Sequence, residues 1–200
     1  MENQIPKIFH QIWLGGEEKM PDEHKLLRDI MLALHPDWEY QFWSEENFPP
    51  CINAEYYNLA LKDCYKSDII RYEILAIHGG VYIDTDYLFY KSINPLINGN
   101  NNFFVEENEH WCTNSLMGVA PNHPIMWACI RELPVRFRLY PNRIGYERVG
   151  PGLLTAVLEN FKETAVILPK PLFYSIFSNM VSQQLSHSFP HAYASHLWNN

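Results

Sequence analysis

The chain has 200 residues, of which 47% are hydrophobic and 14% aromatic, and its formal net charge is −8. This length and composition predict one compact domain over residues 1–200 and exclude an intrinsically disordered protein. The negative charge argues against nucleic acid or an anionic membrane as the main partner.

The four cysteines, Cys51, Cys64, Cys112 and Cys129, form neither a C-x-x-C pair nor the spacing of a zinc site. They therefore predict free thiols in a reducing compartment. No apolar run is long enough to span a membrane, and the first residues lack the core of a signal peptide. We expect a cytoplasmic protein, while a domain excised from a longer protein stays open because it would have the same features.

The first predicted strand covers residues 5–14 and ends at a pair of glycines. Trp13 lies at its end, where an indole ring either stacks on a flat ligand such as a nucleobase or belongs to the core. A helix is predicted over residues 21–34, a second strand over 38–43 and a short helix over 54–65.

The most informative stretch, residues 66–95, predicts a helix, a glycine turn and a buried strand over residues 81–83. Ser67 and Asp68 are expected in the first turn of that helix, where a hydroxyl cap and a negative charge are favourable. Asp68 and Arg71 are three residues apart, so their side chains project from one side of the helix.

Two carboxylates, Asp84 and Asp86, follow the predicted strand directly. In open α/β sheets, ligands bind beyond the carboxyl ends of the strands. Carboxylate oxygens suit Mg²⁺ or Mn²⁺, and such an ion in turn holds a diphosphate. The pair therefore predicts a metal–diphosphate site, with a solvated acidic turn as the alternative.

The next part of the chain is expected to add strands over residues 103–106 and 116–120. Asn114 precedes the second of these strands. The loop between them contains Glu106, Glu107 and Glu109, which either face a ligand or form an ordinary solvated acidic turn.

A helix is then predicted over residues 123–132, ending before Pro134, and another opens at Gly150, where backbone amides would face an anion. His196 and Trp198 lie close to the C-terminus. Such a segment frays unless something ties it down, so we expect it either to close over a ligand or to dock on the core.

The segment SDIIRYEILAIHGGVYIDTD, residues 67–86, resembles the core signature of glycosyltransferase family 32, the transferases with a DXD sugar-binding motif. The segments IPKIFHQIWLGG and GPGLLT and the terminal His-x-Trp are similar to further motifs of that family, which includes capsular polysaccharide and Golgi mannosyltransferases. More distantly, the chain is similar to the glucosyltransferase domains of the large clostridial toxins. The resemblance implies a GT-A fold: a single α/β domain whose mostly parallel, Rossmann-like sheet is flanked by helices.

The resemblance also implies roles for individual residues. Asp86 would bind the metal directly, and Asp84 would contact the ribose, or the metal through water. Asp68 and Arg71 would hold the sugar hydroxyls, with Arg71 also in reach of phosphate, so that the catalytic set is Asp68, Arg71 and Asp86. The implied substrate-binding residues are Ile12, Trp13 (beside the nucleobase), Asp68, Arg71, Tyr82, Asp84, Asp86, Asn114, Gly150, His196 and Trp198 (as a lid), and the implied metal ligands are Asp84, Asp86 and His196.

The implied function is transfer of a sugar from a nucleotide-diphosphate sugar, with UDP-sugars favoured, to a hydroxyl of a glycan or glycoconjugate acceptor, as in polysaccharide biosynthesis. Mn²⁺ or Mg²⁺ is the expected cofactor, since the leaving group departs with negative charge. Retention of configuration is implied, although Glu106, Glu107 and Glu109 keep open an inverting reaction with a carboxylate base. A nucleotide-sugar hydrolase and a non-catalytic nucleotide- or carbohydrate-binding module are the alternatives.

Overall fold

A computed structural model describes residues 4–142, 145–174 and 190–198 of the chain. The strands are β1 (Ile8–Ile12), β2 (Glu39–Trp43), β3 (Gly80–Ile83), β4 (Tyr87–Phe89), β5 (Asn102–Asn108), β6 (Trp111–Val119), β7 (Ile167–Leu168) and β8 (Ala194–His196). The helices are α1 (Asp22–Ala33), α2 (Ala54–Leu59), α3 (Asp63–His78), α4 (Asn94–Ile97), α5 (Pro124–Leu139), α6 (Gly145–Arg148) and α7 (Pro151–Leu158), with short 3₁₀ helices η1 (Glu17–Lys19), η2 (Glu159–Phe161) and η3 (Lys170–Leu172).

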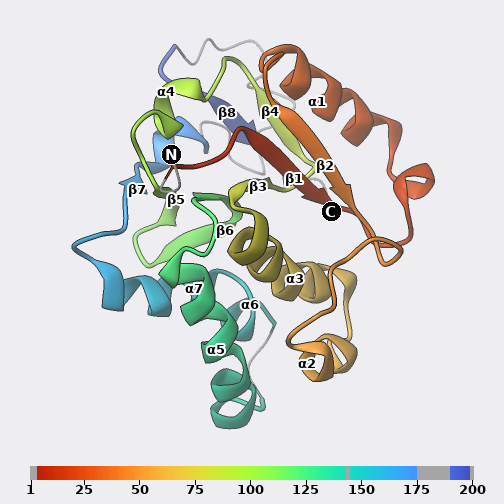
Figure 1. The fold of residues 1–200 in the computed structure, drawn as a ribbon, viewed down its shortest axis with the longest axis vertical. Coiled ribbons are helices and arrows are strands. Elements are labelled where there is room, and N and C mark those ends of the chain that lie inside the picture. Colours follow the sequence, from red (N-terminus) through yellow and green to blue (C-terminus); the bar gives the residue numbers. More distant parts are fainter. Residues whose placement is uncertain (1–3, 143–144, 175–189, 199–200) are drawn as a thin grey trace.

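Six strands form one mixed sheet in the order β2-β1-β3-β6-β5-β7, and β4 and β8 form a separate two-stranded sheet (Figure 1). The pairs β1–β2, β1–β3 and β5–β7 are parallel, whereas β3–β6 and β5–β6 are antiparallel. Parallel pairs predominate, which confirms the predicted fold class. The carboxyl ends of β1 and β3 therefore lie at the same edge as the start of β6 and the end of β5.

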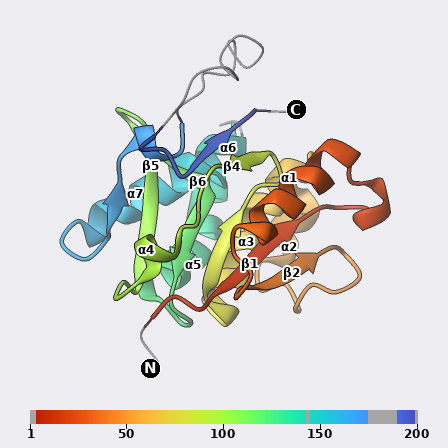
Figure 2. The same ribbon diagram turned by 90° about the horizontal axis from the view of Figure 1, so that it is seen from above.

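The side chains of each strand point alternately into two hydrophobic cores, because successive side chains lie on opposite faces of a sheet. In β3, Tyr82 packs with α3, α5 and α7, whereas Val81 and Ile83 pack with the other core, which Phe89 and Ile93 help to form. Figures 1 and 2 show the sheet between these two layers, with α1, α4, β4 and β8 covering the second face.

Helix α3 is buried on every side from Asp68 to Ala76, so it forms the centre of the first core. It begins at Asp63, one turn earlier than predicted, so Ser67 lies inside the helix and its hydroxyl donates to the carbonyl oxygen of Asp63 (3.0 Å) instead of capping the helix. Its end agrees with the prediction. A Cβ at Gly80, whose φ is 92°, would lie 2.7 Å from the carbonyl oxygen of Ile8, so only glycine lets β3 approach β1.

The predicted break at Pro134 is wrong, because α5 continues through this residue to Leu139. Proline lacks the N–H group that would bond to the carbonyl of Ile130. The side chain of Asn53 replaces it, with Nδ2 donating to that carbonyl at 3.2 Å. A partner from a distant segment therefore satisfies the group that proline leaves unpaired.

The strands β5 and β6 are longer than predicted, so β5 includes Glu107 as well as Glu106, and Asn114 lies inside β6 instead of before it. The ladder between the two strands tolerates these polar residues because it is irregular there. Phe104 pairs with Met117, but Val105 pairs with Thr113. Residues 114–116 thus form a bulge, which redirects their polar groups.

The four cysteines are free thiols, as predicted. Across the described ranges, we find no helix that combines the length and the apolar character needed to cross a membrane.

The buried His10 makes stability depend on pH. Its Nδ1 accepts a hydrogen bond from Trp43 Nε1 (3.0 Å) and its Nε2 donates to the carbonyl oxygen of Gly79 (2.8 Å), an arrangement that requires the neutral ring. Burial lowers the pKa of His10 to about 4. Between about pH 6.5 and pH 4, this histidine is therefore protonated in the unfolded chain and neutral in the folded chain. The contribution of His10 to the unfolding free energy is therefore complete above that window and decreases as the pH falls through it.

We expect His10 to contribute a loss of about 2 kcal/mol in unfolding free energy between pH 7 and pH 5. Urea unfolding at both pH values should show a smaller loss for His10→Gln than for the unchanged protein. The exposed His191 provides the control, since His191→Gln should keep the full loss. An equal loss in His10→Gln would contradict the assignment.

Candidate active site

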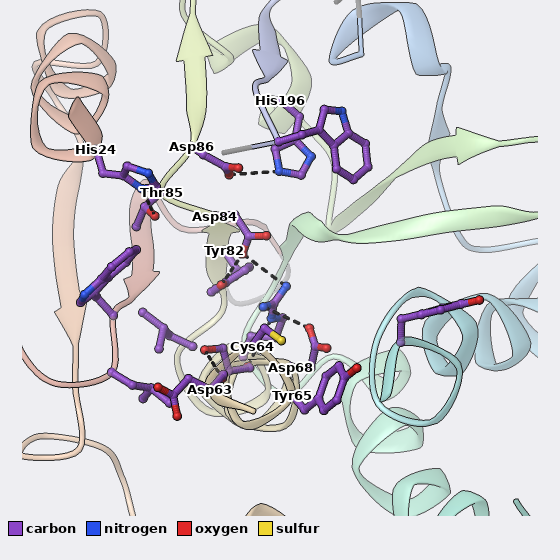
Figure 3. Close-up of a pocket in the computed structure, with 17 residues that line it drawn as sticks. His24, Asp63, Cys64, Tyr65, Asp68, Tyr82, Asp84, Thr85, Asp86 and His196 are labelled. Atoms are coloured by element: carbon purple, nitrogen blue, oxygen red, sulfur yellow. Dashed lines mark hydrogen bonds and ion pairs between the residues drawn. The ribbon is translucent and has the colours of Figure 1, made fainter. Parts of the chain in front are cut away.

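A cavity of about 570 Å³, here called the main cavity, opens at the edge of the sheet where β1 and β3 end (Figure 3). Trp13 follows β1, and Asp84 and Asp86 follow β3. Helix α3 supplies Asp68 and Arg71 to its floor. The volume lies within the usual range for small-molecule sites.

The floor of the cavity is a buried ion pair on α3. Arg71 Nη2 lies 3.1 Å from Asp68 Oδ1, and both side chains are almost fully buried. Asn114 Nδ2 donates to the same Asp68 oxygen at 2.8 Å. Burial raises the pKa of Asp68, and the attraction of Arg71 opposes this increase only in part.

Arg71 links this ion pair to the DXD segment. Its Nη1 donates to the carbonyl oxygen of Asn114 (2.8 Å) and lies 3.4 Å from Asp84 Oδ1, and its guanidinium lies over the Tyr82 ring at 4.4 Å. Burial lowers the pKa of Arg71, but Asp84, Tyr82 and Asp68 outweigh it and raise the pKa above its ordinary value. The permanently charged guanidinium therefore orients two carboxylates, and its donors point mainly at protein acceptors.

Asp84, Asp86 and His196 form a group, here called the cation cluster, in which one potential ligand atom from each lies within 4.8 Å of the others. His196 Nε2 lies 3.0 Å from Asp86 Oδ1, and Asp84 Oδ1 accepts from the Tyr82 hydroxyl at 2.6 Å. The Nδ1 atom of His196 is buried and has no hydrogen-bond partner in the part of the chain that the structure describes. Two carboxylates and an imidazole with a spare buried nitrogen fit a divalent cation.

The C-terminal segment that supplies His196 is part of the fold. Strand β8 pairs with β4, with Tyr87 opposite His196, and Leu197 N donates to the carbonyl oxygen of Asp86 (2.9 Å). The His196 ring stacks on Tyr87 on one side and on Trp198 on the other, with centroid distances of 4.6 and 4.3 Å. Deleting this segment would remove a strand, so the lid expectation applies to Trp198 alone.

Trp198 itself has a backbone φ of 57°, a left-handed conformation that a bulky residue adopts only where its surroundings hold it. It is 37% exposed and lines the main cavity. Its ring is therefore fixed against His196 while one part remains open to a ligand.

The opposite wall carries Trp13, which lines the cavity and meets the His24 ring edge-on at 5.3 Å. His24 Nδ1 lies 2.7 Å from the hydroxyl of Thr85, between the two aspartates. His24 in α1 thus contacts both Thr85 and Trp13, and it connects Trp13 to the segment that carries the cation cluster.

Nine of the eleven predicted substrate-binding residues line the main cavity: Ile12, Trp13, Asp68, Arg71, Tyr82, Asp84, Asp86, His196 and Trp198. Asn114 lines a neighbouring cavity. Gly150 lines neither, because its carbonyl accepts from the Tyr72 hydroxyl (3.2 Å) and a Cβ there would lie 3.2 Å from Asp68 Oδ2. Gly150 thus lies beside Asp68, and the expected contact between its helix start and an anion stays a prediction.

The sequence reasoning missed several residues that line the main cavity: Leu14, His24, Asp63, Cys64, Tyr65, Ser67, Thr85 and Tyr146. Cys64 and Ser67 precede Asp68 and Arg71 by one helical turn, so an earlier start of α3 would have revealed them. No local pattern marks His24 or Tyr146, since both reach the cavity through tertiary packing.

Residues 21–103 match the family described as "Glycosyltransferase sugar-binding region containing DXD motif". The chain is 32% identical over 136 residues to inositol phosphoceramide mannosyltransferase 3 of Schizosaccharomyces pombe, covering 65% of this chain and 37% of that protein. It is 30% identical over 188 residues to mannosyl phosphorylinositol ceramide synthase SUR1 of Saccharomyces cerevisiae, covering 87% of this chain and 48% of that protein. The chain thus spans less than half the length of these two relatives.

Three solved structures share the fold at low sequence identity. The PaToxG glycosyltransferase superposes with a TM-score of 0.66 at 18% identity, covering 80% of this chain and 70% of that one. For the UDP-bound glycosyltransferase domain of the YGT toxin the TM-score is 0.58 at 12% identity, with 84% and 80% covered. For galactosyltransferase LgtC with donor and acceptor sugar analogs it is 0.54 at 12%, with 94% and 86% covered.

Together, these matches confirm the predicted resemblance to DXD-motif glycosyltransferases and the predicted GT-A fold.

The cation cluster predicts that Asp86→Asn lowers the affinity for Mn²⁺ by about tenfold or more, because a carboxylate next to His196 is lost. Titration of free Mn²⁺ by electron paramagnetic resonance measures this affinity. Asp63→Asn is the control, since Asp63 also lines the cavity but lies outside the cluster. Equal Mn²⁺ affinity in both variants would rule the cluster out as the ion site.

The buried ion pair predicts that Asp68→Ala lowers the unfolding free energy by about 3 kcal/mol, since one partner of a buried pair is removed. Asp63→Ala, on the same helix, breaks only the pair with Lys66 on the surface (3.7 Å) and should change stability by less than about 1 kcal/mol. Urea unfolding compares the two. A similar small effect in both would mean that the Asp68–Arg71 pair is not structural, and that Asp68 serves the ligand alone.

Proposed function

This chain carries the sugar-binding region of the DXD-motif glycosyltransferases on a GT-A fold, and from that premise we propose that it is a metal-dependent glycosyltransferase. It would move a sugar from a nucleotide-diphosphate sugar, preferably a UDP-sugar, to a hydroxyl of a glycan or glycoconjugate. The observation that carries this proposal is the cluster of Asp84, Asp86 and His196 inside the main cavity.

The nucleotide end of the donor is assigned to Trp13 and Ile12, which line the cavity beyond the end of β1. An indole ring fixed edge-on by His24 offers a flat face for a nucleobase. Thr85 connects this wall to the cation cluster, since its hydroxyl contacts His24 and it lies between Asp84 and Asp86 in the chain. We therefore assign the diphosphate to the region between Trp13 and His196.

A bound Mn²⁺ or Mg²⁺ would neutralise the charge that develops on the leaving diphosphate. The residues that would hold it are Asp86 and His196, with Asp84 contacting the ion or the ribose. Tyr82 and Arg71 fix the Asp84 carboxylate at 2.6 and 3.4 Å, so it needs little reorganisation when a donor binds.

The donor sugar is assigned to the floor formed by Asp68 and Arg71. Asp68 accepts sugar hydroxyls there, while Arg71 acts mainly as a positioning residue because four of its contacts go to protein oxygens. The pair is fixed before the donor arrives, and this rigidity favours a defined sugar orientation.

We infer retention of the anomeric configuration by front-face displacement. The aspartates that line the main cavity each have a partner: Lys66 for Asp63, Arg71 for Asp68, Tyr82 for Asp84 and His196 for Asp86. An aspartate that acted as a covalent nucleophile would first have to break the contact with its partner. In the front-face route, the bond between the anomeric carbon and the phosphate oxygen breaks while the acceptor oxygen bonds to that carbon from the same face. The acceptor hydroxyl gives its proton to the departing phosphate oxygen.

Two observations bear on which sugar and which nucleobase the donor carries. One curated relative is named as an inositol phosphoceramide mannosyltransferase, and one structural relative, a toxin domain, is UDP-bound. Both UDP-sugars and GDP-mannose are therefore worth testing, with UDP-sugars as our first choice.

The proposal predicts that UDP-glucose, UDP-galactose, UDP-N-acetylglucosamine or GDP-mannose raises the melting temperature only when Mn²⁺ is present. At a donor concentration 100 times the dissociation constant, binding stabilises the fold by about 2.7 kcal/mol. Chelation with EDTA, or the Asp86→Asn substitution, should abolish the shift, and Asp63→Asn should keep it.

The same donors, radiolabelled, separate the alternatives. Transfer to added p-nitrophenyl glycosides supports the transferase, and NMR of the product reports the anomeric configuration. Release of free sugar alone would identify a hydrolase, and metal-dependent binding without any turnover would identify a binding module. Either result would contradict the proposal.

A further inference from the structure

A second cavity of about 490 Å³, here called the side cavity, adjoins the main cavity. The two share Asp84, Tyr146, His196 and Trp198 in their walls. The side cavity lies between the β5–β6 hairpin and the start of α7, where Glu107, Trp111 and Pro151 line it. A molecule bound there would therefore lie directly beside the cation cluster.

A β-bulge directs Glu107 into this cavity. Glu106 pairs with Cys112 and Asn108 pairs with Trp111, so Glu107 is the extra residue on β5. Bulges redirect a side chain and occur often next to active sites. Of the three glutamates on the hairpin, only Glu107 lines the side cavity and is partly buried, while Glu106 and Glu109 are exposed.

Glu107 lies close to the cation cluster, since Asp84 and His196 line the same side cavity. Burial raises the pKa of its carboxyl group, whereas His196 and Lys170 have the opposite, smaller effect. Glu107 is therefore a half-buried hydrogen-bonding group close to the cation cluster. Glu106, in contrast, turns its carboxylate toward the backbone N–H of Lys170 (3.5 Å).

Aromatic rings form the other walls. Trp111 and Tyr146 meet edge-to-face at 5.9 Å, and Tyr146 is 46% exposed. A Cβ at Gly152 would lie 2.3 Å from Trp111 Cζ3, so the Trp111 ring rests directly on the backbone of α7. Trp198 adds a third ring, fixed by its stacking on His196.

We propose that the side cavity binds a polyhydroxylated six-membered ring of the acceptor, a pyranose or an inositol, with Glu107 accepting a hydrogen bond from a ring hydroxyl. Trp111 and Tyr146 pack against its C–H faces. This inference rests on the proposed function, because it places the acceptor beside the donor.

The composition of the walls supports this class of ligand. A ring with hydroxyls at its edge and C–H groups on its faces needs both apolar aromatic surface and a charged acceptor, and carboxylates make strong hydrogen bonds to hydroxyls. The buried Thr113, Asn114 and Ser115 add polar groups along the strand. A hydrocarbon chain would leave Glu107 without a hydrogen-bond partner, which is unfavourable.

The test uses saturation-transfer NMR with methyl α-D-glucopyranoside, methyl α-D-galactopyranoside, methyl α-D-mannopyranoside and myo-inositol as probes. The pyranosides and the inositol distinguish a glycan acceptor from an inositol-bearing one. We expect at least one probe to bind, and we expect Glu107→Gln and Trp111→Ala each to lower its affinity about tenfold. Glu109→Gln is the matched control on the same hairpin and should bind normally.

Trp111→Phe accompanies Trp111→Ala, since it keeps a ring on α7 if the smaller residue fails to fold. The Mn²⁺-dependent rise in melting temperature with donor, measured on the same proteins, shows whether each variant keeps the main cavity intact. Absence of binding by every probe to the unchanged protein would overturn the inference. So would unchanged probe binding in both Glu107→Gln and the folded Trp111 variant. If the unchanged protein did not bind any of the donors, the proposed function would be refuted instead.

Discussion

The buried guanidinium of Arg71 is the constraint on which the site depends. It is 4% exposed, and it must be surrounded by acceptors because an unpaired buried charge is strongly unfavourable. Asp68 on its own helix, Asp84 after β3 and the carbonyl of Asn114 in β6 supply them. Helix α3, the segment after β3 and the more distant strand β6 are thereby held at fixed positions around one cavity.

The mixed sheet brings these elements to one edge. β6 runs antiparallel to β3, so its first residues lie beside the end of β3, and Asp84 N donates to the carbonyl oxygen of Ser115 at 2.8 Å. The two bulges in the β5–β6 ladder then redirect Asn114 toward Asp68 and Glu107 into the side cavity. A regular ladder would have given these residues the simple alternation of a strand.

The small β4–β8 sheet completes the cation cluster. The chain leaves Asp86 along β4, and the C-terminal segment returns beside it as β8, so His196 comes to lie 3.0 Å from Asp86. Tyr87 and Trp198 hold the imidazole ring between them. A cluster assembled from residues 84–86 and 196 can exist only when the fold is complete, so binding of an ion there would be coupled to folding.

The sequence alone determined the features that depend on local spacing. The three-residue interval of Asp68 and Arg71, the glycine turn and the carboxylates after a buried strand all follow from helix and strand geometry. The resemblance added His196 and Trp198. Only the tertiary structure decided that α5 passes through Pro134, that Gly150 lies beside Asp68, and that His24, Glu107 and Tyr146 reach the two cavities. These outcomes depend on partners and strand registers far away in the chain, which no local pattern encodes.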